Sequence, residues 1–543
     1  MKLRVALILL AAPALWGADA VFDAMQAELK RSMTLSLEQL EKPYFISYSI
    51  DDGTNWSAAA VLGGLINADA AKFRNPSLQV RVGGYDFDNS GAGGRGGGRA
   101  GMRGFPLDDD PLVIRHYLWL ETDAAYKNAV RAIAQKRSAQ RSVNMREQLA
   151  DFYPAKPFTL LEDGAPVNFD SRAWNDRVKR LSALFAAYPQ LRDSLVEYDA
   201  VDSVHRYVNS EGTAIRQPQR EASIHIRAAI QAPDGMILRD SALFYTQDVA
   251  KMFPEDELAQ AARDVAGALT KLAAAPAGDS YSGPILFEGV ASAQLLAEIL
   301  GRNLHMTRGG SGAPGGRGGR GGRGGGAQAA TELEGRRGVR IMPEMFDVVD
   351  DPTLPLFGHA EVDDEGVPAQ RVSLVEKGVL KDFLRTRTPV RGFNESNGHG
   401  FLGGAPAPSN LIITSSEKTP LAELRQKMID LCRQRGLPYA IIVRKLDFPA
   451  AGGEVAPPLY VYQLYVDGHE EMIRAVQLRG VNARSLKDIL FAGDDRATLN
   501  YVEAGGAGST GVTVVAPSVL IDDLEMVKAE ENLPKLPIAP PPM

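Results

Sequence analysis

Hydrophobic positions in the first part of the chain follow two different spacings. Phe22, Met25, Leu29 and Met33 lie three or four residues apart, which is the spacing of one apolar helix face. Over residues 44–51, apolar and polar side chains alternate, as they do in a strand with one buried face. The pattern predicts an opening helix that is followed by an antiparallel sheet.

Four later segments complete this first predicted unit. Residues 122–149 and 173–188 have the spacing of helices, a second series of strands covers residues 194–245, and a helix over residues 256–274 follows. Helices that are segregated around antiparallel strands favour an α+β fold over a parallel, doubly wound sheet. We therefore expect an N-terminal α+β domain with an antiparallel sheet and flanking helices over residues 21–280.

From residue 281 the pattern changes to strands with few helices. Strands are predicted at residues 340–349, 371–375, 439–443, 459–466, 471–478 and 511–520. We expect a mainly β, barrel- or sandwich-like C-terminal domain over residues 281–530. The tail over residues 531–543 is rich in proline and is expected to be disordered.

Two glycine-rich insertions interrupt this plan, at residues 90–104 and 309–326. Arg317, Arg320 and Arg323 are spaced as in RGG segments, some of which bind single-stranded nucleic acid. The net charge of -7 argues against such binding, and neither insertion has the Gly-Lys-Ser/Thr ending of a phosphate-binding loop. We expect both insertions to be flexible, solvated loops, and we expect no nucleic-acid partner.

The N-terminus has the three parts of a secretory signal peptide. Lys2 and Arg4 precede an almost wholly apolar run over residues 5–16, and Ala18 and Ala20 fit a small-x-small cleavage site. The apolar run is too short for a membrane span, and nothing like it recurs. We therefore expect a signal peptide over the first twenty residues, an exported periplasmic or extracellular protein, and no stable membrane span.

Composition adds limits on the chemistry. Apolar residues make up 45% of the chain and charged residues 23%, as in an ordinary soluble globular protein. Cys432 is the single cysteine, so no intramolecular disulfide can form, and its neighbours have helical spacing, which favours a buried core thiol. No Gly-x-Ser-x-Gly motif for a serine nucleophile is present.

Several segments, in their order along the chain, are similar to one family. They are residues 207–212, 284–293, 363–370, 374–380, 396–400 and 517–521. Together these segments resemble the TldD/PmbA family, also called modulators of DNA gyrase. The resemblance implies two types of protein: TldD-type zinc peptidases, and PmbA-type (TldE) proteins that lack the metal and act as partners of the catalytic subunit. It also implies a role in degrading extended peptides or maturing modified ones.

The resemblance implies where a zinc site would lie. TldD-type members have a His-Glu-x-x-x-His helix and a third ligand, usually Cys, near the C-terminus. Here the two histidine positions hold Phe287 and Ser292, the glutamate of the general base is kept as Glu288, and residues 501–506 contain no cysteine. A catalytic zinc needs about three protein ligands, so we expect no metal and no cofactor, and a chain closer to the PmbA type. Glu288 is either a surviving general base or an acid beside the dipole of the following helix.

Three functions follow from these observations. The first is an exported, zinc-free subunit that binds extended peptide or pairs with a TldD-type subunit or a second copy of itself. The second is an active metallopeptidase with substitute ligands, for which His359 and His399 are the first residues to inspect. The third is an extracytoplasmic scaffold or adhesion protein that uses its Gly/Arg-rich loops.

Overall fold

The computed structural model describes most of the chain. The described residues are 19–37, 40–91, 100–101, 104–140, 149–165, 167–249, 253–308, 331–450, 455–505, 508–529, 533–537 and 539. The predicted signal peptide therefore lies almost wholly outside the described residues, as do most of the two glycine-rich insertions and the last part of the tail. Among the described helices, none combines the length and apolar character that crossing a membrane requires.

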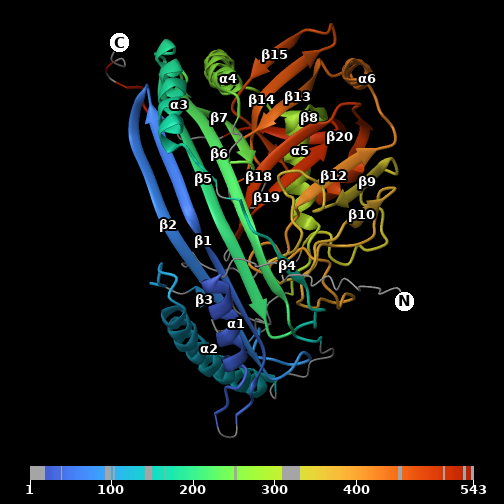
Figure 1. The fold of residues 1–543 in the computed structure, drawn as a ribbon. Coiled ribbons are helices and arrows are strands. Elements are labelled where there is room, and N and C mark those ends of the chain that lie inside the picture. Colours follow the sequence, from blue (N-terminus) through green and yellow to red (C-terminus); the bar gives the residue numbers. More distant parts are fainter. Residues whose placement is uncertain are drawn as a thin grey trace, which may run out of the picture.

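The N-terminal unit is a curved, seven-stranded sheet with helices on its outer face (Figure 1). Its strand order is β3-β2-β1-β5-β6-β4, and β7 pairs with β6. The strands are β1 Pro43–Val61, β2 Gly64–Val82, β3 Ala100–Gly101, β4 Thr159–Leu161, β5 Leu191–Asn209, β6 Ala214–Gln231 and β7 Ile237–Thr246. The long strands β1, β2, β5 and β6 pair antiparallel, which confirms the predicted antiparallel sheet.

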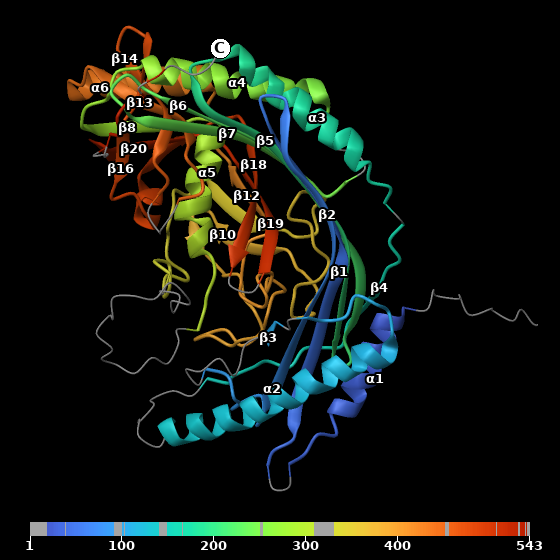
Figure 2. The same cartoon turned by 90° about the vertical axis from the view of Figure 1, so that its left-hand side faces the viewer.

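Two pairs of helices cover the two ends of the outer face of this sheet (Figure 2). The helices are α1 Ala20–Ser32, α2 Pro111–Gln140, α3 Ser171–Ala183 and α4 Glu255–Ala274. Ile46, Tyr48 and Ile50 of β1 pack with α1 and α2 in one hydrophobic core, and Ala58 and Ala60 of the same strand pack with α3 and α4 in another. Alternate residues of β1 thus face both helix pairs, and the opposite, concave face is turned toward the C-terminal half of the chain.

The long helix was predicted to begin at Thr122 but begins at Pro111. Asp110 accepts hydrogen bonds from the backbone N–H groups of Leu112 and Val113 at 2.8 and 3.2 Å, and so acts as the N-cap. Proline is favoured in the first turn of a helix, because its missing N–H has no partner there anyway. The Asp-Pro pair was therefore the start signal that the hydrophobic spacing alone did not reveal.

The C-terminal unit contains two sheets with a buried helix between them. The first has the order β11-β10-β9-β12-β19-β18, and the second has the order β15-β14-β13-β8-β20-β16, with β17 paired to β20. Both sheets and helix α5 contribute to one hydrophobic core, and α6 packs on the outer face of the second sheet, where Cys432 is buried as predicted. The elements are β8 Tyr281–Phe287, α5 Val290–Ile299, β9 Phe346–Asp350, β10 Val372–Glu376, β11 Val379–Leu380, β12 Asn410–Ser415, α6 Leu421–Arg435, β13 Tyr439–Leu446, β14 Pro458–Tyr465, β15 Glu470–Ile473, β16 Val476–Arg479, β17 Ile489–Ala492, β18 Ala497–Gly505, β19 Gly508–Ala516 and β20 Val519–Lys528.

The expected fold class is confirmed, with one refinement. The chain is α+β, and its C-terminal unit is mainly β and sandwich-like. However, both C-terminal sheets are mixed, because β12 pairs parallel with β19 and β13 pairs parallel with β8. The concave N-terminal sheet curves around this unit (Figure 2), and the two units meet along β7.

Candidate functional site

A cavity of about 790 Å³ lies between the two units. Seven consecutive residues of β7, from Arg239 to Tyr245, form one wall, and Val290 and Gln294 of α5 with residues 499–502 of β18 form the other. This volume lies in the range of about 300–1,000 Å³ that is typical of ligand sites. The interface between the units therefore contains a cleft that is large enough for part of a peptide.

The wall formed by β7 presents an open strand edge to this cleft. β7 pairs with β6 without a register shift, and no other described strand pairs with it. The carbonyl of Ser241 accepts a hydrogen bond from Lys445 Nζ at 2.6 Å, so it points away from β6. In an antiparallel strand the N–H and C=O of one residue point to the same side, and every second residue repeats that direction. The backbone N–H and C=O groups of Leu243 and Tyr245 therefore also point toward the cleft. The strand β18 across the cleft likewise pairs, among the described strands, with β19 alone.

A polar clasp joins the two units at this edge. The carboxylate of Asp240 binds Lys445 Nζ at 2.5 Å and accepts a hydrogen bond from the hydroxyl of Tyr460. The side chain of Asp240 is only 3% exposed, and burial together with the Asp240 charge raises the pKa of Tyr460. Farther along β7, the ring of Tyr245 stacks on that of Phe357 with centroids 4.9 Å apart. Contacts at two places along β7 thus join the two units beside the cleft.

Acidic groups lie on the concave sheet where the cleft continues past Tyr245. Burial raises the pKa of Glu221, and the charge of Asp199 raises it further. Burial and these two carboxylates also raise the pKa of Tyr245, to about 12, whereas burial lowers the pKa of His225. Glu221 lines a second cavity, of about 520 Å³, that lies between this sheet and residues 357–362. An anionic ligand would therefore meet repulsion along this part of the cleft.

Glu288 does not line these cavities. Its carboxylate binds Arg425 of α6 at 2.9 and 3.2 Å and Arg444 of β13 at 2.7 Å. Arg444 also binds Glu470 of β15 at 2.8 and 3.0 Å, so Glu288 belongs to a network of four charged groups. The structure places the candidate general base among arginines, near α6 and β15.

The two other positions of the family motif are buried and filled. Phe287 is fully buried in the core of the C-terminal unit. Ser292 is also fully buried, and its hydroxyl donates a hydrogen bond to the carbonyl of Pro517 at 2.6 Å. Near the third position, burial raises the pKa of Glu503. A zinc ion does not fit these positions, because an aromatic ring and a hydroxyl that already donates its proton offer it no ligands.

The two histidines chosen for inspection lie apart from Glu288. His399 is fully buried, with Nδ1 2.9 Å from the carbonyl of Asn397 and Nε2 3.1 Å from Asp350 Oδ1. His359 has Nδ1 3.1 Å from the carbonyl of Pro352, and it lines the second cavity. In the part of the chain that the structure describes, no group of three or more His, Cys, Asp or Glu residues could hold a metal ion.

Sequence reasoning missed the residues that build the cleft. Asp240, Lys445 and Tyr460 lie on three strands and are brought together only by the packing of the two units. One signal was available: Lys445 follows the apolar run 440–443, where a charged residue calls for a partner. Its partner, 205 residues away in the sequence, could not be identified from spacing.

Known proteins resemble this chain in parts of its sequence and in its fold. Residues 325–528 match the profile described as "PmbA/TldA metallopeptidase C-terminal domain". A metalloprotease of Archaeoglobus fulgidus is 41% identical over 174 residues, which are 30% of this chain and 38% of that protein. A metalloprotease of Methanothermobacter thermautotrophicus is 27% identical over 196 residues, which are 35% of this chain and 38% of that protein. The chain therefore covers well under half of the length of either relative.

Solved structures share the fold over nearly the whole chain. TldE from Thermococcus kodakarensis matches with a TM-score of 0.61 and 12% identity, covering 93% of this chain and 100% of that one. A proposed modulator of DNA gyrase from Thermotoga maritima matches with a TM-score of 0.58 and 16% identity, covering 89% and 96%. At these identities the likeness concerns the fold alone.

Proposed function

We propose that the chain is a member of the PmbA/TldD family, whose C-terminal domain profile its residues 325–528 match, and that it binds extended peptide in the cleft between β7 and β18, without a zinc ion of its own. The family is metallopeptidase-related, so a peptide is the ligand class that this membership favours. The observation that carries the proposal is the open edge of β7. Leu243 and Tyr245 turn backbone N–H and C=O groups toward a cavity of about 790 Å³.

Pairing with the backbone would make this binding tolerant of sequence. An extended peptide that adds to a sheet edge gains main-chain hydrogen bonds, and pockets for alternate side chains provide the selectivity. In the cleft Lys445 already donates a hydrogen bond to the carbonyl of Ser241. The peptide would therefore begin to pair with β7 at Leu243 and continue toward Tyr245. A folded domain has few free backbone groups to offer, and this favours extended chains.

The rival is an active metallopeptidase. It is supported by the name of the relative from Archaeoglobus fulgidus, a metalloprotease that is 41% identical over its matched segment. Against it stand the buried ring of Phe287, the hydroxyl of Ser292 bound to Pro517, and the arginines around Glu288. Zinc analysis of the purified protein separates the two functions, and tightly bound zinc at one ion per chain would exclude the zinc-free proposal.

We propose further that the protein is exported and acts beside a partner. The basic and apolar pattern of residues 1–20 supports export. The partner would be a TldD-type subunit that carries the zinc, or a second copy of this chain. Peptide captured on β7 would then be presented to the catalytic centre of the partner.

Substitution of Leu243 tests the edge-pairing proposal. Leu243→Pro removes one outward N–H, and proline is tolerated in an edge strand where the N–H faces away from the sheet. Leu243→Ala is the matched control, because it removes a side chain that is 42% exposed and keeps the N–H. The probe is a fluorescein-labelled, unstructured peptide of about twelve residues, followed by anisotropy.

The two variants should behave differently. Leu243→Pro should bind the peptide about tenfold more weakly, because one main-chain hydrogen bond is lost and the peptide fits less well beside the proline. Leu243→Ala should stay within about twofold of the unsubstituted protein. Equal affinity for all three proteins would contradict edge pairing, and the absence of any peptide binding would remove the proposed function itself.

A further inference from the structure

Helix α2 lies on the outer face of the N-terminal sheet, at one end of the molecule (Figure 2). Ile114 and Leu118 are fully buried and pack in the core that α2 shares with α1 and β1. Leu112, His116 and Leu120 follow one another at intervals of four residues, which places them together on the side of the helix that is turned away from these buried residues. The first turns of α2 therefore present a second face to solvent.

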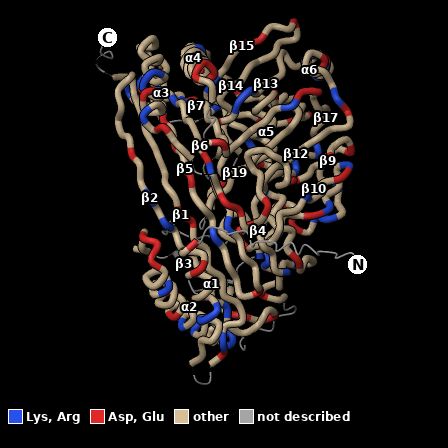
Figure 3. Tube along the Cα trace, viewed as in Figure 1, with Lys and Arg blue, Asp and Glu red and all other residues tan. Residues whose placement is uncertain are grey.

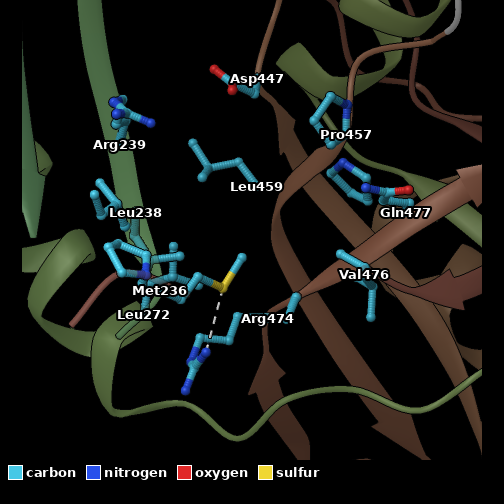
Figure 4. A pocket seen from close by; sticks show the side chains of 15 residues that line it. Met236, Leu238, Arg239, Leu272, Asp447, Pro457, Leu459, Arg474, Val476 and Gln477 are labelled. Atoms are coloured by element: carbon cyan, nitrogen blue, oxygen red, sulfur yellow. Dashed lines mark hydrogen bonds between the residues drawn. The ribbon is translucent and has the colours of Figure 1, made fainter. Parts of the chain in front are cut away.

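This outer face of α2 is apolar. Four large apolar side chains in these turns are between 37% and 75% exposed: Leu112, Val113, Trp119 and Leu120. Together they expose about 400 Å², which is as much as the largest apolar patch of a typical monomer, and such patches are often functional. In contrast, Leu238 and Leu459 come from the two different units and meet in one hydrophobic cluster, at the edge of a cavity of about 380 Å³ (Figure 4).

Charged residues of opposite sign lie at the two ends of this face (Figure 3). Residues 108–110, which lead into α2, are three aspartates, and Arg74 binds one of them, Asp109, at 2.6 Å. Lys127 and Arg131 lie in the second half of the helix, on the same side as the apolar face. The outer face of α2 thus begins acidic, continues apolar and ends basic.

The basic end keeps a positive charge. The side chain of Arg131 donates hydrogen bonds to the carbonyl of Lys127 at 3.3 Å and to Asn128 Oδ1 at 2.5 Å, which are both neutral acceptors. Lys127 forms an ion pair with Asp123 at 2.5 Å. Of these three charged side chains, two are basic and one is acidic, so this end of the face can attract an acidic partner.

We propose that the outer face of α2 binds the same face of a second copy of this chain, with the two helices antiparallel and with His116 near the two-fold axis. A two-fold interface needs a face that is complementary to itself. Leu112 and Leu120 each lie four residues from His116, so antiparallel pairing brings Leu112 opposite the partner's Leu120, twice. It also brings the acidic beginning of each helix toward the basic end of the other and sets the two helix dipoles antiparallel.

The size of the face agrees with such an interface. A stable interface buries about 800 Å² on each partner, and its centre is apolar and poor in charged residues, whereas its rim is polar. The apolar side chains supply the centre, and the charged residues at both ends supply the rim. The proposal chooses between the two partners left open above, and it does not depend on peptide binding at β7.

The oligomeric state of the purified protein tests this interface. Sedimentation velocity over a wide range of concentrations should show a dimer. Leu120→Glu should weaken the dimer by at least about thirtyfold, because it places an unpaired charge at the centre of the interface. The matched control is Ile66→Glu, since Ile66 is 64% exposed on β2 at the other end of the sheet, and this variant should dissociate within about twofold of the unsubstituted protein.

A double variant tests the antiparallel arrangement. Leu112→Lys alone should also weaken the dimer, but Leu112→Lys combined with Leu120→Glu should restore much of it, because each new cation would then lie opposite a new anion of the partner. The two positions are two turns apart, about 12 Å along the helix, so the new charges cannot pair within one chain. A double variant that dissociates as readily as the single ones would overturn the antiparallel pairing.

Cross-linking gives a measurement that does not rely on disruptive variants. Cys432 is the single cysteine and is buried, so His116→Cys adds one accessible thiol. A short bismaleimide should join two chains of His116→Cys and should not join chains of Ile66→Cys. Chains that stay unjoined in His116→Cys would overturn the position of the axis.

Three other results would overturn the interface as a whole. They are a monomer at every concentration, including one that binds lipid vesicles instead, a dimer that persists in folded Leu120→Glu, and a dimer that Ile66→Glu weakens equally. The labelled peptide should bind Leu120→Glu with unchanged affinity, because the cleft lies on the opposite, concave face of the sheet. Loss of the dimer and loss of peptide binding are therefore separate outcomes.

Discussion

Replacement of Asp240 and Lys445 by alanine, singly and together, measures how strongly the clasp holds the two units around the cleft. The two charged groups lie 2.5 Å apart, with side chains that are 3% and 24% exposed. At an effective dielectric constant of about 20, opposite unit charges this close attract by several kcal/mol. Partial desolvation of both ions opposes most of that attraction, so we expect a net coupling free energy of about 2 kcal/mol.

The assay is urea unfolding followed by tryptophan fluorescence, to which Trp56 and Trp174 contribute from beside the hydrophobic core that also contains residues of β7. The coupling free energy is the difference between the effect of the double variant on the free energy of unfolding and the sum of the effects of the two single variants. The matched control is Arg180–Glu255, which has two contacts of 2.8 Å but side chains that are 57% and 37% exposed. That exposed pair should couple by about 0.2–1 kcal/mol. A coupling for Asp240–Lys445 no larger than that of the control would refute the argument that the clasp stabilises the interface.

Two further predictions concern the turn of residues 363–367, where the carbonyl of Glu365 accepts a hydrogen bond from Tyr207 of the N-terminal sheet. Burial and the neighbouring Asp363 raise the pKa of Glu365 to about 7, so the folded state binds a proton more tightly than the unfolded chain. The free energy of unfolding should therefore fall as pH rises from about 4.5 to about 7 and level off above that, and urea titrations of Glu365→Gln should show a smaller fall. Gly366 has φ +77°, and a Cβ there would lie 2.8 Å from Tyr207 Cε1. Gly366→Ala should lower the urea midpoint more than the control Gly436→Ala does, because Gly436 also has a positive φ, of +68°, but has open space around it. Equal midpoints for the two variants would contradict a tight contact between the units at Gly366.

The sequence predicted those parts of the fold that depend on local spacing. The opening helix, the long antiparallel strands and the buried position of Cys432 all follow from the period of the apolar residues, and each is confirmed. The start of α2 was missed because it depends on the capping side chain of Asp110 rather than on hydrophobic spacing. The two parallel strand pairs of the C-terminal unit were missed because their partners lie far apart in the sequence.

The candidate site also contains features that follow from the local sequence and features that depend on distant residues. The residue types at the three motif positions can be taken directly from the sequence. The direction in which the Glu288 side chain points could not be predicted from the sequence, because it depends on Arg425 and Arg444, which lie more than 130 residues away. The cleft itself could not be predicted, because its two walls belong to units that meet only through tertiary packing.

The surroundings of Glu288 give a physical reason for an acid at this position that does not depend on catalysis. Arg425 and Arg444 both point their guanidinium groups at its carboxylate, and Glu470 binds Arg444 from the other side. Burial lowers the pKa of Arg444, but the hydrogen bond to Glu288 and the charge of Glu470 outweigh that effect and raise it. An uncharged residue at position 288 would leave two partly buried cations to share one carboxylate. The network therefore requires an acid whether or not catalysis does, so a glutamate at a motif position supports peptidase activity only together with its histidines.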